Sequence, residues 1–182
     1  GLGRQEDDPS VDRLLAALTS EEPLPPLEAD AEVADWCLAP GVARGRTCGG
    51  NLALIAATVG TPYQLRTDGR IVLLEDVCEP PYRIDRMLAQ LRLAGLFERC
   101  AAVGFGEMLD CAPPDTARYD LRGVVHEALA GLPLPVLWGL PFGHGARNQT
   151  VPIGVKATLD ADRGRLTFHE AAATSHGMTD EA

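Results

Sequence analysis

A carboxylate and a histidine each follow an apolar run in this sequence. Glu75 comes directly after RIVLL, and His144 stands in GLPFGHGARN, downstream of PVLWGL. In α/β sheets, ligand-binding and catalytic groups usually lie at the carboxyl ends of strands. A carboxylate that orients an imidazole lets the imidazole act as the general base of a nucleophilic triad. The pattern therefore predicts an acid–base pair made by Glu75 and His144.

The setting of His144 differs from that of the other histidines. Its neighbours Gly143 and Gly145 have no side chains to pack around a buried ring. We interpret these glycines as letting the loop approach a neighbouring domain and present the imidazole. The other histidines are predicted to be surface or structural residues: His126, His169 and His176.

Two further carboxylates, Asp76 and Glu79, follow Glu75. An acidic side chain before a helix stabilises it through the helix dipole by about 0.3–1 kcal/mol. That role suits Glu79, which is adjacent to a helix predicted to start at Pro81, better than it suits Glu75. The sequence leaves open which of the three carboxylates points at His144.

A nucleophile for such a triad is missing from the pattern. No serine lies in a glycine-rich elbow of the G-x-S-x-G kind. Cys78 is close to Glu75, but its acidic neighbours disfavour a reactive thiolate. The chain contains three serines: Ser10, Ser20 and Ser175.

Alternating helical and strand patterns must position these groups. Apolar spacing predicts helices over 11–20 with Ser10 as N-cap, over 51–60 with Asn51 as N-cap, from Pro81 to Gly95, and around 121–129. Strands are expected at 70–74, 101–107 and 135–140, with hairpin turns at Asp68-Gly69 and at 162–164. We therefore predict an α/β domain of the swivelling β/β/α type, with a mixed, partly antiparallel, barrel-like sheet and flanking helices.

Composition excludes several classes of function. The net charge of −10 on 182 residues disfavours binding to nucleic acid or to an anionic membrane. No apolar run approaches the roughly 20 residues needed to span a bilayer. The five cysteines form no CxxC pair or zinc pattern, which favours free thiols in a reducing cytoplasm and predicts no metal site and no cofactor.

Four motifs in order resemble the C-terminal domain of the LD-carboxypeptidases, a serine peptidase family that includes muramoyltetrapeptide carboxypeptidase and the microcin C self-immunity proteins. The resemblance covers about residues 36 to 170. The motifs are GGNLALIAATVGTPY, GRIVLLEDVCEPPYRIDRMLAQL, GLPFGH and VPIGVKATLD.

The resemblance implies a Ser-Glu-His triad divided between two domains, with the glutamate at Glu75 and the histidine at His144. The serine and the oxyanion hole would come from an N-terminal domain that this chain lacks, so we expect no peptidase activity from it alone. The organisation expected is a helix and interdomain linker over 1–35, the C-terminal domain over 36–172 and a frayed tail over 173–182. Asn51 is expected either to line the substrate cleft or only to cap its helix.

By the same resemblance, the full enzyme would release the terminal D-alanine from a murein tetrapeptide in cytoplasmic cell-wall recycling. Its partners would be the muropeptide and the serine-bearing domain; a homodimer is compatible with the sequence, which does not fix the oligomeric state. Two alternatives stay open. One is an immunity-type carboxypeptidase acting on a peptide-nucleotide antibiotic, and the other is a non-catalytic module that binds peptides or dimerises.

Overall fold

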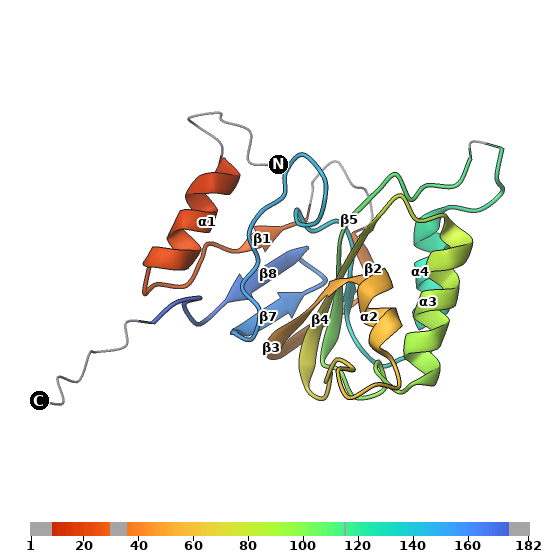
Figure 1. Ribbon diagram of the computed structural model, residues 1–182, viewed down its shortest axis with the longest axis horizontal. Coiled ribbons are helices and arrows are strands. Elements are labelled where there is room, and N and C mark those ends of the chain that lie inside the picture. Colours follow the sequence, from red (N-terminus) through yellow and green to blue (C-terminus); the bar gives the residue numbers. More distant parts are fainter. Residues whose placement is uncertain (1–8, 30–35, 115, 175–182) are drawn as a thin grey trace, which may run out of the picture.

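The computed structural model describes residues 9–29, 36–114 and 116–174 (Figure 1). Within these ranges eight strands form one sheet, in the order β1-β8-β7-β3-β4-β5-β6-β2. The strands are β1 (Leu27–Glu28), β2 (Cys37–Ala39), β3 (Val42–Asn51), β4 (Arg70–Val77), β5 (Ala102–Leu109), β6 (Val136–Leu137), β7 (Lys156–Asp160) and β8 (Arg165–Phe168). The helices are α1 (Pro9–Thr19), α2 (Leu52–Thr58), α3 (Pro81–Leu93) and α4 (Leu121–Leu129).

The central part of the sheet is parallel. Strands β3, β4, β5 and β6 run in the same direction, so their carboxyl ends meet at one edge. Helices α2, α3 and α4 connect them and lie together on one face (Figure 1). A core of aliphatic side chains with Phe97 and Phe105 fills the space between these helices and the sheet. The parallel part therefore brings several strand ends together on a rigid support.

The remaining strands pair antiparallel. β7 lies beside β3, β8 beside β7 and β1 beside β8, while β2 pairs with β6 at the opposite edge. The predicted α/β class with a mixed, partly antiparallel sheet is confirmed. The barrel-like closure is wrong, because the very short strands β1 and β2 are the two edges of an open sheet and do not pair with each other.

The predicted helices are present. The side chain of Asn51 accepts a hydrogen bond from the backbone N–H of Leu54, and Asp120 caps α4 by accepting from Gly123. α1 starts at Pro9, so Ser10 lies inside the helix and is not its N-cap. None of the described helices is long and apolar enough to cross a membrane.

The hairpin predicted at Asp68-Gly69 is wrong. Residues before β4 form turns, and only β4 itself is a strand. Both edges of β4 are occupied by the parallel strands β3 and β5, so no edge remains for a hairpin partner. The second predicted hairpin is present as β7 and β8, with Gly164 in its turn at a φ of 65°.

The long strand β3 was not anticipated, because its sequence is rich in glycine and arginine. Glycine is normally depleted in strands. In β3 it serves close packing, since a Cβ on Gly49 would overlap the backbone carbonyl oxygen of Leu73 in β4. The composition of this segment is therefore typical of a loop, but the segment folds as a strand at the centre of the sheet.

The predicted linker contributes to the domain. Leu27 in β1 pairs with Leu166 in β8 and is completely buried, and Leu24 and Ala17 join the same core. This second core covers the face of the sheet opposite to the three clustered helices. Residues 30–35 and 175–182, which hold the predicted linker end and most of the tail, lie outside the described residues.

Candidate active site

The structure brings Glu75 and His144 together. The Nδ1 atom of His144 lies 2.7 Å from Oε2 of Glu75, which comes from the carboxyl half of β4. The Glu75 side chain is only 10% exposed, whereas that of His144 is 51% exposed. An ionised carboxylate only accepts hydrogen bonds, so the proton of this bond lies on Nδ1. The lone pair of Nε2 is then left for proton transfer.

Alternation along β4 decides which carboxylate faces the histidine. Neighbouring residues in a strand point to opposite faces. Glu75 lies on the face of Ile71 and Leu73, which belong to the second core. Asp76 lies on the helix-covered face, so it cannot face His144.

Asp76 and Glu79 have other partners. Asp76 accepts hydrogen bonds from the Nδ2 group of Asn51 and from the backbone N–H of Ala53, both at 3.0 Å. Glu79 forms an ion pair with Arg83 at 3.1 Å, one helical turn away. Of the three carboxylates that the sequence left open, only Glu75 contacts the imidazole.

The loop that carries His144 is attached to β5. The backbone N–H of Leu140 donates to the carbonyl of Phe105 at 3.0 Å, and that of Glu107 donates to the carbonyl of Phe142 at 2.7 Å. The side chains of Leu140 and Phe142 are buried in the second core. The loop thus continues along β5 beyond the end of β6, which fixes the position of the histidine.

The two glycines beside His144 allow the loop to pack against its own sheet. Gly143 has a φ of 124°, and a Cβ there would lie 3.1 Å from Oε2 of Glu75. A Cβ on Gly145 would overlap the carboxylate of Glu107. Within this domain, the two glycines let the loop contact two carboxylates. The predicted approach to a neighbouring domain stays a prediction.

Glu107 is a site residue that the sequence analysis missed. Between β4 and β5, Leu74 pairs with Phe105 but Asp76 pairs with Met108, so Gly106 and Glu107 together oppose Glu75. Such a β-bulge re-aims side chains and is frequent near active sites. Simple alternation would have placed Glu107 with Phe105 on the helix side, and no signal in the sequence marks the bulge.

The Glu107 carboxylate is largely enclosed by the loop. Its Oε2 atom is buried and takes no hydrogen bond from the described residues. Its Oε1 atom lies 4.0 Å from Nε of Arg147, on the same loop as His144. Two carboxylates, Glu75 and Glu107, therefore flank the histidine loop from neighbouring strands.

Nucleophile candidates are not placed against His144. Ser10 lies within α1, Ser20 accepts the backbone N–H of Glu22, and Ser175 is outside the described residues. Cys78 is exposed at the end of β4, with a φ of 56°. In the part of the chain that the structure describes, neither a serine nor a cysteine is hydrogen-bonded to the His144 ring.

The other predicted residues have ordinary surroundings. His126 is exposed on α4, and His169 shares a 2.7 Å hydrogen bond with the Thr158 hydroxyl. His176 is outside the described residues. Across the described ranges, no three His, Cys, Asp or Glu side chains are grouped as metal ligands.

The fold and the site together define an α/β domain with a carboxylate-oriented histidine at the ends of its parallel strands. The sequence profile of the LD-carboxypeptidase C-terminal domain matches residues 44–159. The chain belongs to the LD-carboxypeptidase family.

Relatives of this chain include a murein tetrapeptide carboxypeptidase and a microcin C7 self-immunity protein. The murein tetrapeptide carboxypeptidase of Pseudomonas aeruginosa is 34% identical over 157 residues, which are 86% of this chain and 48% of that protein. The microcin C7 self-immunity protein MccF of Escherichia coli is 31% identical over 133 residues, covering 71% of this chain and 38% of that one. The crystal structure of muramoyltetrapeptide carboxypeptidase from Oxalobacter formigenes superimposes with a TM-score of 0.75 at 28% identity, over 91% of this chain and 55% of that one. The chain spans about half the length, or less, of these proteins.

Proposed function

We propose that this chain supplies the glutamate and histidine of a Ser-Glu-His triad in a serine-type LD-carboxypeptidase that releases the terminal D-alanine from murein tetrapeptides. The observation that carries the proposal is the 2.7 Å contact between Glu75 and His144, with the ring half exposed. Membership of the family and the murein tetrapeptide carboxypeptidase relative support the choice of substrate.

The proposed chemistry follows from the orientation of the ring. Glu75 holds the proton on Nδ1, so Nε2 takes the proton of an incoming serine hydroxyl as the serine attacks the peptide carbonyl. The resulting imidazolium, stabilised by the Glu75 carboxylate, then returns the proton to the nitrogen of the departing D-alanine. Water repeats the cycle on the acyl-enzyme and restores the serine.

The serine is proposed to come from an N-terminal domain. The His144 side chain is 51% exposed and so is accessible to such a domain, and no described serine is bonded to it. A nucleophile and its oxyanion hole are both required for acyl transfer. We therefore expect this chain alone to release no D-alanine.

The same proposal includes a cellular location and a candidate substrate contact by Asn51. Free thiols at all five cysteines support a reducing cytoplasm as the place of action. Asn51 uses Oδ1 to cap α2 and one Nδ2 hydrogen to bind Asp76, which leaves one N–H for a substrate contact. Its capping role accounts for the residue without that contact.

The proposal can be tested by joining the chain to the part of the P. aeruginosa relative that this chain does not match, which is proposed to carry the serine. The joined protein is expected to release D-alanine from a murein tetrapeptide and to label its serine with a fluorophosphonate. His144→Ala should lower the release rate by about 10³-fold or more, because the general base is lost. His126→Ala, a matched change of an exposed histidine, should leave the rate within twofold.

Two results would contradict the proposal. One is a folded joined protein in which His144→Ala and His126→Ala have the same rate. The other is a folded joined protein whose serine is neither labelled nor active, which would favour a module that binds peptides without catalysis.

A second candidate function is supported by the MccF relative, whose name describes self-immunity to microcin C7. In that case the same Glu75 and His144 would serve hydrolysis of a peptide-nucleotide antibiotic. Assaying the joined protein on a murein tetrapeptide and on an aminoacyl sulfamoyl adenosine separates the two substrates. A higher kcat/KM on the nucleotide compound would replace the first candidate with the second.

A further inference from the structure

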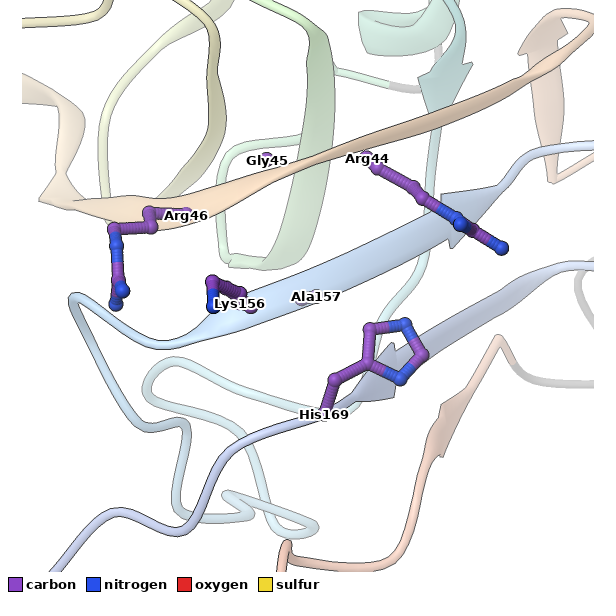
Figure 2. Close-up of a pocket in the computed structure, with 6 residues that line it drawn as sticks. All are labelled: Arg44, Gly45, Arg46, Lys156, Ala157 and His169. Atoms are coloured by element: carbon purple, nitrogen blue, oxygen red, sulfur yellow. The ribbon is translucent and has the colours of Figure 1, made fainter.

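A basic groove lies on the sheet away from the Glu75–His144 pair. It has a volume of about 500 Å³ and crosses β3, β7 and the end of β8 (Figure 2). Its lining residues are Arg44, Gly45, Arg46, Lys156, Ala157 and His169. We call it the β3–β7 groove.

Strand register gathers these side chains on one face. Arg46 is paired with Lys156 across β3 and β7, and the backbone N–H of His169 donates to the carbonyl of Lys156 at 2.8 Å. Arg44 is two residues before Arg46 and so shares its face of β3. Helices α2, α3 and α4 do not extend over this end of the sheet (Figure 1).

The groove is positively charged within an acidic chain. One carboxylate, Glu170, accepts hydrogen bonds from Arg46 at 2.7 Å and pairs with the Lys156 ammonium at 3.0 Å. The backbone N–H and the ammonium of Lys156, together with Arg46, lower the pKa of Glu170 to about 2, so it is ionised at neutral pH. A single negative charge against three permanent positive charges leaves an excess of positive charge, although the whole chain carries −10.

The basic side chains of the groove differ in whether they pair with other groups of the protein. Glu170 holds Arg46 and Lys156 side by side, and the Thr158 hydroxyl holds the His169 ring through Nε2 at 2.7 Å. Arg44 is exposed and makes no ion pair with any residue that the structure describes. The groove therefore combines fixed cationic walls with one uncommitted guanidinium.

We propose that the β3–β7 groove binds the phosphoryl group of a small phosphorylated ligand. Guanidinium groups bind phosphate oxygens in bidentate geometry, and an ammonium beside them adds a point charge. The strongly negative remainder of the chain repels extended polyanions, which favours a compact ligand over nucleic acid or a membrane. The groove is separate from the candidate active site: Asn51, which pairs with Glu75, is five residue steps from Arg46 along β3, or about 17 Å.

Isothermal titration of the 182-residue chain with inorganic phosphate and with glycerol 3-phosphate tests the proposal. At constant ionic strength set with chloride, saturable binding with a Kd of about 1 mM or tighter is expected for both ligands. Arg44→Gln should weaken it about tenfold, the loss expected for one charge-assisted hydrogen-bonding group. Because Arg44 has no ion pair within the described residues, this variant should keep the circular dichroism spectrum of the parent.

Arg165→Gln is the matched control. Arg165 lies on β8, pairs with Glu28 and does not line the groove, so its removal changes the net charge by the same amount. Phosphate affinity within twofold of the parent is expected for it. Equal weakening by Arg44→Gln and Arg165→Gln would mean attraction by net charge alone and would overturn the proposal.

Two further results would overturn it. One is the absence of saturable binding by either ligand at concentrations around the expected Kd of about 1 mM. The other is binding only to vesicles that contain phosphatidylglycerol, since this would make the groove a membrane contact. Neither result depends on the peptidase assay, so this proposal and the proposed function fail separately.

Discussion

The carboxylate of Glu107 in β5 occupies the space that a side chain on Gly145 would need, so the histidine loop and the β5 bulge fit each other. This contact holds the loop at Gly145, one residue after His144. It links the backbone of the loop to the strand next to the one that carries Glu75.

Gly145→Ala should destabilise the domain by about 1 kcal/mol, because the added methyl group overlaps the Glu107 carboxylate, which lies at the end of a flexible side chain and has to move aside. Combining it with Glu107→Ala should recover part of that loss, since the obstacle is gone. Urea unfolding of the two single variants and the double variant measures the coupling. Additive free-energy changes would show that the two residues do not constrain each other.

Asp76→Ala should destabilise the domain more than Glu75→Gln. Asp76 is buried and accepts from Asn51 and Ala53, so its loss leaves donors unpaired at the start of α2, at a cost of about 1–3 kcal/mol. A glutamine at 75 still accepts the Nδ1 hydrogen of His144, so stability should change by less than about 1 kcal/mol. The midpoints of urea unfolding compare the two, and equal shifts would contradict this division of roles.

Gly49→Ala should prevent stable folding, whereas Gly50→Ala should be tolerated. Both glycines have positive φ, 135° and 145°, so either change strains the backbone by about 1–3 kcal/mol. Only at Gly49 would the methyl group also overlap the Leu73 carbonyl; around Gly50 the space is open. Soluble yield and thermal unfolding are the measurements. Similar behaviour of the two variants would argue against the tight contact between β3 and β4.

Cys78 should react first with iodoacetamide in the folded chain. It is exposed, whereas Cys48, Cys100 and Cys111 are buried and burial raises the pKa of each of these three thiols. Peptide mass spectrometry after a short reaction locates the label, and Cys78→Ala should remove the fast phase. Fast labelling of Cys100 would contradict the described burial.

Stability should fall at alkaline pH because of Cys48 and Cys100. Burial raises the pKa of Cys48 from 9.0 to about 11 and that of Cys100 from 9.0 to about 12. A thiol whose pKa is higher in the folded state stabilises the fold fully below its unfolded pKa, and this is lost as the pH rises through the folded value. Unfolding free energy is therefore expected to decline between pH 9 and about 12, with a shallower slope in Cys100→Ala. An unchanged slope in that variant would exclude Cys100 as a source.

Local patterns were sufficient for most elements of this fold. The apolar spacing of α3, the cap at Asn51 and the turn of the β7–β8 hairpin are set by residues within a few positions of each other. Such signals survive in a sequence because they depend on neighbours along the chain. The same holds for the apolar run that ends at Glu75.

Three features could not be read from local patterns. The turn at Asp68-Gly69 resembles a hairpin, but the strand after it has parallel neighbours on both sides. The glycines of β3 resemble a loop, but they allow close packing against β4. Glu107 resembles a helix-facing residue, but a bulge turns it toward the histidine loop.

The sequence by itself determined that a carboxylate and a histidine would stand at strand ends of an α/β domain, because strand length and apolar content are local properties. Only the tertiary structure decided that Glu75, and not Asp76 or Glu79, contacts His144 at 2.7 Å. That choice depends on which face of β4 receives the loop from β6 and on the extra residue in β5. Both are set by packing between segments that are some 30 to 70 residues apart in the chain, to which the local pattern gives no access.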